Sequence, residues 1–301
     1  MAETIVPMAF ALLGFFCFMR VEGQAPGSIR NAAGVRLMVA ADDADPTLRI
    51  TVPGYSGDEA AFLILLPEHV TVRARGKSDA THIYLWQPGN SGAALAWSAT
   101  SDSLQYEKDL EDGILIIARA TLEADGVLFH YEFRNRSAVD YDMVYAPTDP
   151  RLTGVFHDAR LERTYVHHAG GFELLASETP QRMTMPLNEW LPARYMASYT
   201  WAVPAKLVDK RADGITYYNK SRVVDEPMIA TLSSDGKWVV ASFTRTVGNV
   251  WSNPELTCQH VDPTAALPAH GMAVIELKML ILRRGLKDAL RKVIQQRESL
   301  H

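Results

Sequence analysis

Short runs that alternate apolar and polar residues recur along most of the chain, and clusters of turn residues separate them. In the run 127–135 the large apolar side chains occupy every second position: Val127, Phe129, Tyr131 and Phe133. Polar residues, among them His130, hold most of the positions between. This period of two predicts a strand with one buried face.

The same kind of pattern predicts strands at 35–39, 48–52, 60–66, 70–74, 82–86, 95–98, 114–122, 143–146, 163–167, 196–201, 228–232, 238–243 and 272–282. The turn residues at 123–126 and 233–236 favour hairpins between the flanking strands. These are more strands than a small immunoglobulin-like sandwich holds. The predicted fold is all-β: a large antiparallel β-sandwich formed by a single domain, 35–301.

One segment, 286–298, has clear helical spacing. Its apolar residues recur every three or four positions: Leu286, Ala289, Leu290, Val293 and Ile294. We expect a C-terminal amphipathic helix that packs across a sheet or an open sandwich edge; a helix that binds a partner is the alternative. Residues 24–34, with Pro26 and two glycines, are expected to form a flexible lead-in.

The N-terminus has a different character. Residues 5–19 form an almost unbroken apolar run, shorter than the roughly 20 residues that cross a bilayer. The run is typical of a signal peptide, so we expect removal of 1–23 and a secreted or periplasmic protein that meets the membrane only through this segment. Glu3 and the lack of Lys or Arg before the run are atypical. An N-terminal anchor, or an apolar segment packed on the fold, is therefore the alternative.

Composition excludes some classes of partner. The formal net charge is −5, and no Lys/Arg cluster interleaves with aromatic residues, so nucleic-acid binding is not expected. Of the two cysteines, Cys17 lies in the predicted signal, which leaves Cys258 as the one thiol. No nucleotide-binding glycine pattern and no Gly-x-Ser-x-Gly motif occurs, and no cofactor is predicted.

Two stretches resemble the galactose mutarotase-like family. The segment 126–142 is similar to the family's strand ending in an Asn-rich turn, and 267–271 resembles its final Leu-x-Pro-Gly turn before the closing strand. His270 stands where the family usually has Pro. The resemblance implies a supersandwich fold, shared by sugar epimerases and some polysaccharide lyases, and a carbohydrate ligand. The family's paired histidines and late glutamate cannot all be placed here.

Residues suited to chemistry are concentrated in 251–263. In an extended chain Cys258, His260 and Asp262 share one face. We predict His260 as an acid/base with Asp262 orienting it. The other candidates here are Glu255 for catalysis and Trp251 and Asn253 for substrate binding. A metal site at Cys258, His260 and Asp262 is one alternative; a turn with a buried thiol and a locally bonded histidine is the other.

Two further clusters supply candidates. Arg163 and His167 share a strand face, which suggests a substrate-binding arginine and a second acid/base. The segment 177–199 holds Trp190, Arg194 and Tyr195, whose side chains suit sugar faces, hydroxyls and carboxylates. Ordinary core packing is the alternative for this segment.

Together these features suggest an exported carbohydrate-binding or carbohydrate-processing protein. If it is catalytic, His260 or His167 would transfer a proton at a sugar carbon, in an epimerase-like or lyase-like reaction, while Arg194 holds an anionic group. This hypothesis expects Trp190, Trp251, His260 and Arg194 on one concave face. The alternative is a non-catalytic structural or interaction module of the cell envelope.

Overall fold

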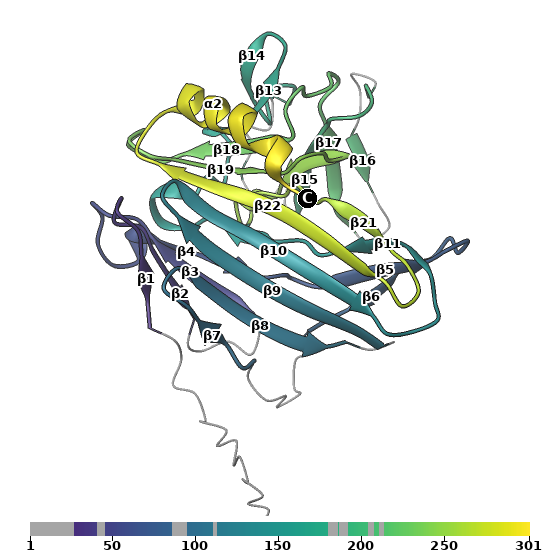
Figure 1. Ribbon diagram of the computed structural model, residues 1–301. Helices are drawn as coiled ribbons and strands as arrows, with labels where there is room; N and C mark the ends of the chain where they lie inside the picture. The colour runs from purple at the N-terminus through teal and green to yellow at the C-terminus, as the bar shows by residue number, and fades with distance from the viewer. Residues whose placement is uncertain are drawn as a thin grey trace, which may run out of the picture.

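The computed structural model describes residues 27–40, 46–85, 95–110, 113–179, 186, 192–203, 208–210 and 214–301. Within these residues the strands form four sheets, and the helix α2 (Leu286–Gln296) lies near the C-terminus (Figure 1). Short 3₁₀ helices occur at Gly57–Ala60, Gly154–Phe156 and Arg297–Ser299. None of the described helices combines the length and the apolar character needed to cross a membrane. The predicted signal, 1–23, lies outside the described residues.

The largest sheet has nine strands. In hydrogen-bonded order they are β14 (Gly171–Leu174), β13 (Thr164–His168), β18 (Met228–Leu232), β19 (Val239–Phe243), β22 (Met272–Leu282), β10 (Gly126–Asn135), β9 (Ile114–Glu123), β8 (Ser103–Asp109) and β7 (Ser98–Ala99). The five-stranded sheet consists of β1 (Ile29–Arg30), β2 (Arg36–Val39), β3 (Thr47–Thr51), β4 (Ala61–Leu65) and β12 (Asp149–Arg151).

Two four-stranded sheets complete the fold. The first is β21 (Thr264–Leu267), β11 (Tyr141–Tyr145), β5 (Val70–Ala74) and β6 (Thr81–Ile83). The second is β16 (Val208–Lys210), β17 (Thr216–Asn219), β15 (Ala193–Ser198) and β20 (Asn249–Ser252). Strand pairs run antiparallel, as predicted, apart from the parallel pair β15 and β17.

The hairpin of β9 and β10 is the centre of the large sheet. Its apolar face is fully buried in the core, as the alternation predicts: Val127, Phe129, Tyr131 and Phe133. Glu123 pairs with Gly126, so two residues make the turn. A Cβ at Gly126 would lie 2.0 Å from the carbonyl oxygen of Met279, so the close approach of β22 requires glycine here.

Strands β18 and β19 are buried on both faces. Ile229 and Val240 face the main core, whereas Ala230, Ala241 and other alternate residues face α2. The apolar stripe of α2 closes this second cluster through Ala289 and Val293, among others. The prediction that the helix packs across a sheet is therefore confirmed.

Part of the segment 24–34, where a flexible lead-in is predicted, forms a short strand. Ile29–Arg30 forms β1, paired with β2, and the Ile29 side chain is buried in the core. Asn31 Nδ2 donates to the carbonyl of Glu123, 2.7 Å away, which ties this turn to the central hairpin. A two-residue strand is too short to show a period, so the sequence pattern missed it.

The two stretches that carry the family resemblance meet in space. The strands β10 and β22 pair along their length, with Arg134 opposite Met272. Beyond their ends, Asn135 Nδ2 donates to the carbonyls of Val139 (2.7 Å) and Pro268 (2.9 Å). One buried amide thus joins the turn after β10 to the turn before β22.

A charged cluster connects α2 to the β9–β10 hairpin. The Asp125 carboxylate contacts the ammonium groups of buried Lys278 (2.7 Å) and of Lys292 (3.0 Å), and it accepts a hydrogen bond from the Gln296 amide (2.9 Å). Burial alone would raise the pKa of Asp125, but these hydrogen bonds outweigh it and lower the pKa from 3.8 to about 2. The charged carboxylate is therefore stabilised by folding.

We predict that Asp125→Asn lowers the free energy of unfolding by about 1 kcal/mol at pH 7, after allowance for solvent screening. Because the folded pKa lies below the unfolded one, the carboxylate stabilises the fold above pH 4 or so and loses this effect as pH falls toward about 2. Urea unfolding across this pH range measures the difference. The exposed Asp109→Asn serves as control, since its partner Arg136 is also largely exposed. A loss for Asp125→Asn that is the same at every pH would contradict the prediction.

Candidate functional site

One face of the first four-stranded sheet is polar and aromatic. Thr71 pairs with Tyr145 and with His82, and paired residues share a face. We call this the β5/β11 face; its residues are His69, Thr71, His82, Tyr84 and Tyr145. The alternate residues point into the core: Val70, Val72, Ile83 and Val144. The face therefore presents titratable side chains from a rigid, buried support.

The imidazoles of His69 and His82 are joined through a hydroxyl. Thr71 Oγ1 lies 3.0 Å from His69 Nδ1 and 2.7 Å from His82 Nδ1. The hydroxyl has one hydrogen to donate, so at least one imidazole must donate its Nδ1–H to the hydroxyl oxygen. Burial, together with the nearby His82, lowers the pKa of His69 to about 4. His69 is therefore neutral at neutral pH.

The segment 251–262 folds back on itself, and an isolated antiparallel bridge pairs Trp251 with His260. Trp251 and His260 exchange backbone hydrogen bonds of 3.1 and 3.0 Å, which places their rings in parallel contact at 3.8 Å. Asp262 holds both rings, since its Oδ2 accepts from Trp251 Nε1 at 2.7 Å and its Oδ1 lies 3.2 Å from His260 Nδ1. The predicted pairing of His260 with Asp262 is thus present in the geometry.

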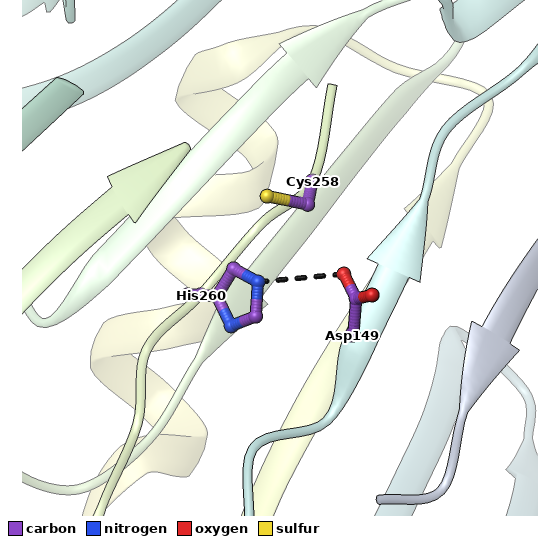
Figure 2. A group of neighbouring side chains, drawn as sticks. All are labelled: Asp149, Cys258 and His260. Atoms are coloured by element: carbon purple, nitrogen blue, oxygen red, sulfur yellow. Dashed lines mark ion pairs between the residues drawn. The ribbon is translucent and has the colours of Figure 1, made fainter. Parts of the chain in front are cut away.

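Asp149 approaches His260 from the opposite side of the ring. Its Oδ1 lies 3.3 Å from His260 Nε2 (Figure 2). Its Oδ2 accepts from Arg151 Nε at 2.7 Å. A backbone bridge between Arg151 and Cys258 brings β12 beside the thiol. Donor atoms of Asp149, Cys258 and His260 all lie within 4.8 Å of one another, and all three residues are buried. This group is able to accept a metal ion.

Charge in this cluster favours the imidazolium form of His260. Burial disfavours that form, but the neighbouring Asp262 and Asp149 carboxylates outweigh it and raise the pKa of His260 well above its ordinary value. Burial raises the pKa of the Cys258 thiol. The His260 residue is only 1% exposed, so it would act on a ligand through Asp262 rather than by direct contact.

Two groups nearer the surface surround this cluster. Burial, and then the Asp149 carboxylate, raise the pKa of Glu68, which lies 3.9 Å from Arg151 Nη2. Burial and the Asp262 carboxylate raise the pKa of Tyr145. Glu68 is half-buried, so its carboxyl group is a better placed proton carrier than the enclosed His260.

A pocket of about 490 Å³ opens beside Trp251 and Asp262. Its remaining lining is Met196, Thr200, Thr246, Val247, Gly248, Asn249, Pro263 and Thr264. The Trp201 ring packs against Gly248, where a Cβ would lie 3.8 Å from two ring carbons. Trp201 is 50% exposed, so it presents aromatic surface next to the pocket.

Five of the predicted site residues come together: Arg194, Trp251, Glu255, His260 and Asp262. Arg194 Nη1 lies 3.6 Å from Glu255 Oε2, and its guanidinium carbon lies 5.9 Å from the centre of the Trp251 ring. The backbone N–H of Ala193 donates to Glu255 Oε1 at 3.0 Å. Trp251, His260 and Arg194 are thus neighbours, but of the three only Trp251 lines the pocket, so their placement on one concave face stays a prediction. Trp190, the fourth residue of that expectation, lies outside the described residues.

Two other candidates, His167 and Arg163, make contacts outside this group. His167 contacts Asp225 (2.7 Å) and Phe172 in the large sheet. The Arg163 guanidinium donates to three backbone carbonyls, those of Val155, His157 and Leu232. Any ligand role for these two residues stays a prediction.

The side chains of Tyr195 and Asn253 also make contacts within the protein. Adjacent strand residues point to opposite sides, so Tyr195 turns away from Arg194 and stacks on Tyr218, with ring centres 4.6 Å apart. Asn253 Oδ1 accepts from the N–H of Leu256 at 2.9 Å. Their roles in binding stay predictions as well.

The sequence interpretation missed several residues of the site: Glu68, His69, Tyr145, Asp149, Arg151 and Trp201. Glu68 and His69 lie between the predicted strands 60–66 and 70–74, and Asp149 lies outside every predicted strand. Trp201 was the last residue of the predicted strand 196–201 and gave no separate signal. Their shared location depends on contacts between distant segments, which no local pattern reveals.

No protein-family model and no curated protein sequence matches the chain. Among solved structures, a galactose mutarotase related enzyme from Lactobacillus acidophilus is 10% identical, with 85% of this chain and 97% of that chain covered and a TM-score of 0.46.

Two other solved structures are also similar. A galactose mutarotase-like protein from Clostridium acetobutylicum is 8% identical over 82% and 95% of the two chains, with a TM-score of 0.39. An alpha-N-acetylgalactosaminidase from Bifidobacterium bifidum, in complex with GalNAc, is 11% identical over 89% of this chain and 37% of its own, with a TM-score of 0.46. The protein is a large antiparallel β-sandwich, and two of these structures bear the name of the family that its sequence resembles.

Proposed function

We propose that the protein binds a carbohydrate in the pocket beside Trp251 and Asp262. The observation that carries this proposal is the half-exposed Trp201 ring beside a pocket whose lining combines apolar side chains with hydroxyl and amide groups. Sugars offer C–H faces that stack on aromatic rings and hydroxyls that bond to polar groups. The volume of about 490 Å³ lies in the range of small-molecule sites.

Asp262 supports the proposal from the wall of the pocket. Trp251 Nε1 and His260 fix its carboxylate, so the oxygen atoms are already oriented before a ligand arrives. A pre-oriented acceptor loses little entropy when a sugar hydroxyl donates to it. Asn249 and Thr264 add amide and hydroxyl groups on the same pocket.

Catalysis in the proposed site is a proton transfer at a sugar carbon, of the epimerase or lyase kind. Asp262 contacts the pocket, and Glu68, whose pKa is raised by burial, supplies a second carboxyl group close to the cluster. Arg194, beside Trp251, suits a sugar that carries a carboxylate. The apolar run at 5–19 supports export, so the ligand would be met outside the cytoplasm.

A heat-stability screen tests the proposal. The protein is melted with hexoses, N-acetylhexosamines, hexuronic acids and short oligosaccharides, because a ligand that binds only the folded state raises the melting temperature. We expect one class of sugar to raise the melting temperature in a dose-dependent way. No shift with any sugar would favour the non-catalytic envelope module.

For a sugar found in this way, we predict that Trp201→Ala weakens binding about tenfold, since it removes a stacking face of about 1.4 kcal/mol. The fold should be little affected, because half of the ring faces solvent. Tyr84→Ala is the matched control: Tyr84 is 56% exposed and does not line the pocket. Calorimetric titration of both variants measures the effect. Weaker binding in Tyr84→Ala, with Trp201→Ala unchanged, would place the site elsewhere.

A further inference from the structure

We propose that Asp149, Cys258 and His260 form a binding site for a divalent transition-metal ion, with Zn²⁺ as the best match. The sequence alone suggested Asp262 as the carboxylate of such a group. The structure places Asp262 on Nδ1 of His260 and Asp149 on Nε2, the side that the thiol shares. The proposal concerns this buried cluster and does not depend on the carbohydrate pocket.

The spacing of the nitrogen and oxygen donors fits a shared ion. His260 Nε2 and Asp149 Oδ1 are 3.3 Å apart. Two ligand atoms bound to Zn²⁺ at 2.0–2.2 Å with a tetrahedral angle are about 3.3–3.6 Å apart, whereas a direct charge-assisted N–H···O bond measures about 2.7–2.9 Å. Asp149 Oδ1 is buried and has no hydrogen-bond partner within the described part of the chain. This oxygen is therefore aimed at the group without being satisfied by it.

Each of the three donors is oriented by an outer partner. Asp262 is placed to accept Nδ1–H of His260, which leaves the Nε2 lone pair for a metal. Arg151 Nε binds Asp149 Oδ2 at 2.7 Å and leaves Oδ1 available. The backbone N–H of Asn253 donates to Cys258 Sγ at 3.3 Å, a contact that would stabilise a thiolate ligand. Such carboxylate–histidine pairs are typical of metal centres.

The chemistry of the donors selects the kind of ion. A thiolate and an imidazole favour Zn²⁺ and related transition metals over Mg²⁺ and Ca²⁺, which prefer oxygen ligands. The negative charges of a thiolate and the Asp149 carboxylate would balance a dication in this buried place. Three protein ligands leave one tetrahedral position, which water would fill.

Cobalt titration of the full-length chain tests the site. In a Cys17→Ser background, so that Cys258 is the single thiol, the protein is freed of metal with a chelator and titrated with Co²⁺. We expect one equivalent of Co²⁺ to produce a thiolate-to-cobalt charge-transfer band and the visible bands of tetrahedral cobalt. Added Zn²⁺ should displace the cobalt ion and raise the melting temperature of the protein. A protein that gives no charge-transfer band at one equivalent contains a buried ion pair only, and the proposal fails.

Two variants locate the ion. Cys258→Ser, checked for folding by circular dichroism, should lose the charge-transfer band and bind Zn²⁺ at least about 100-fold more weakly. The matched control is His82→Gln, a histidine of the β5/β11 face outside the cluster, which should leave both readouts unchanged. Loss of Zn²⁺ binding in His82→Gln, but not in Cys258→Ser, would assign the ion to the β5/β11 face and overturn the proposal. The wild-type cobalt spectrum decides the question if Cys258→Ser does not fold.

Discussion

Replacing Gly126 with alanine is expected to lower the free energy of unfolding by about 3 kcal/mol or more. The added Cβ would lie 2.0 Å from the carbonyl oxygen of Met279 and 2.9 Å from Cα of Leu280. Both contacts are backbone atoms of β22, so the methyl group cannot be accommodated by a side-chain rotation. Shifts of this kind in a packed interior usually cost 1–3 kcal/mol and sometimes more. The upper end is expected because β10 and β22 are central strands of the large sheet.

Urea unfolding of Gly126→Ala beside Gly170→Ala measures this effect. Gly170 has open space where its Cβ would be, so its substitution should change the unfolding free energy by less than about 1 kcal/mol. Similar losses of unfolding free energy in the two variants would contradict the prediction, because they would show that a methyl group fits between β10 and β22.

Asp149→Asn is expected to cost about 2–3 kcal/mol of unfolding free energy. The substitution keeps the shape but removes the charge that faces His260 at 3.3 Å and Arg151 at 2.7 Å. Breaking a buried charge pair from one side is expensive because the partner charge stays buried. The partly exposed Arg151 regains some hydration, which reduces the loss.

The measurement uses chelator-treated protein, so that loss of a bound metal does not add to the effect. Asp58→Asn is the control, since the Asp58 side chain is fully exposed in its pair with Arg49 and its loss should change stability little. An Asp149→Asn protein as stable as Asp58→Asn would contradict the view that His260 depends on two carboxylates.

The elements that the sequence predicted well are those defined by neighbouring residues. The β9–β10 hairpin and α2 each show their period within about a dozen residues, so their buried faces could be assigned before any contact was known. Strand β1 has only two residues, and β12 begins at Asp149-Pro150, so neither carries a readable period. Their positions depend on pairing with β2 and β4.

The site could be predicted only in part for the same reason. Cys258, His260 and Asp262 were recognisable because they alternate along one segment. Asp149, which faces His260 from β12, is brought there by the pairing of β12 with β4 and by the backbone bridge between Arg151 and Cys258. His167 had the right chemistry, but its strand belongs to a different sheet from β21 and β11, and its partner is Asp225. The type of side chain alone therefore did not show that His260 belongs to the candidate site and that His167 lies in another sheet.

Calorimetric titration of the wild-type protein and of Asp262→Asn with the sugar identified by heat stabilisation tests the central claim most directly. The substitution preserves the volume of the side chain and an oxygen that accepts from Trp251 Nε1, but it removes the charge at the pocket. We predict saturable binding of one sugar per chain and a loss of affinity of about 100-fold in Asp262→Asn. Equal affinities in the two proteins, or no binding of any sugar to the wild type, would contradict the assignment of this pocket as a carbohydrate site.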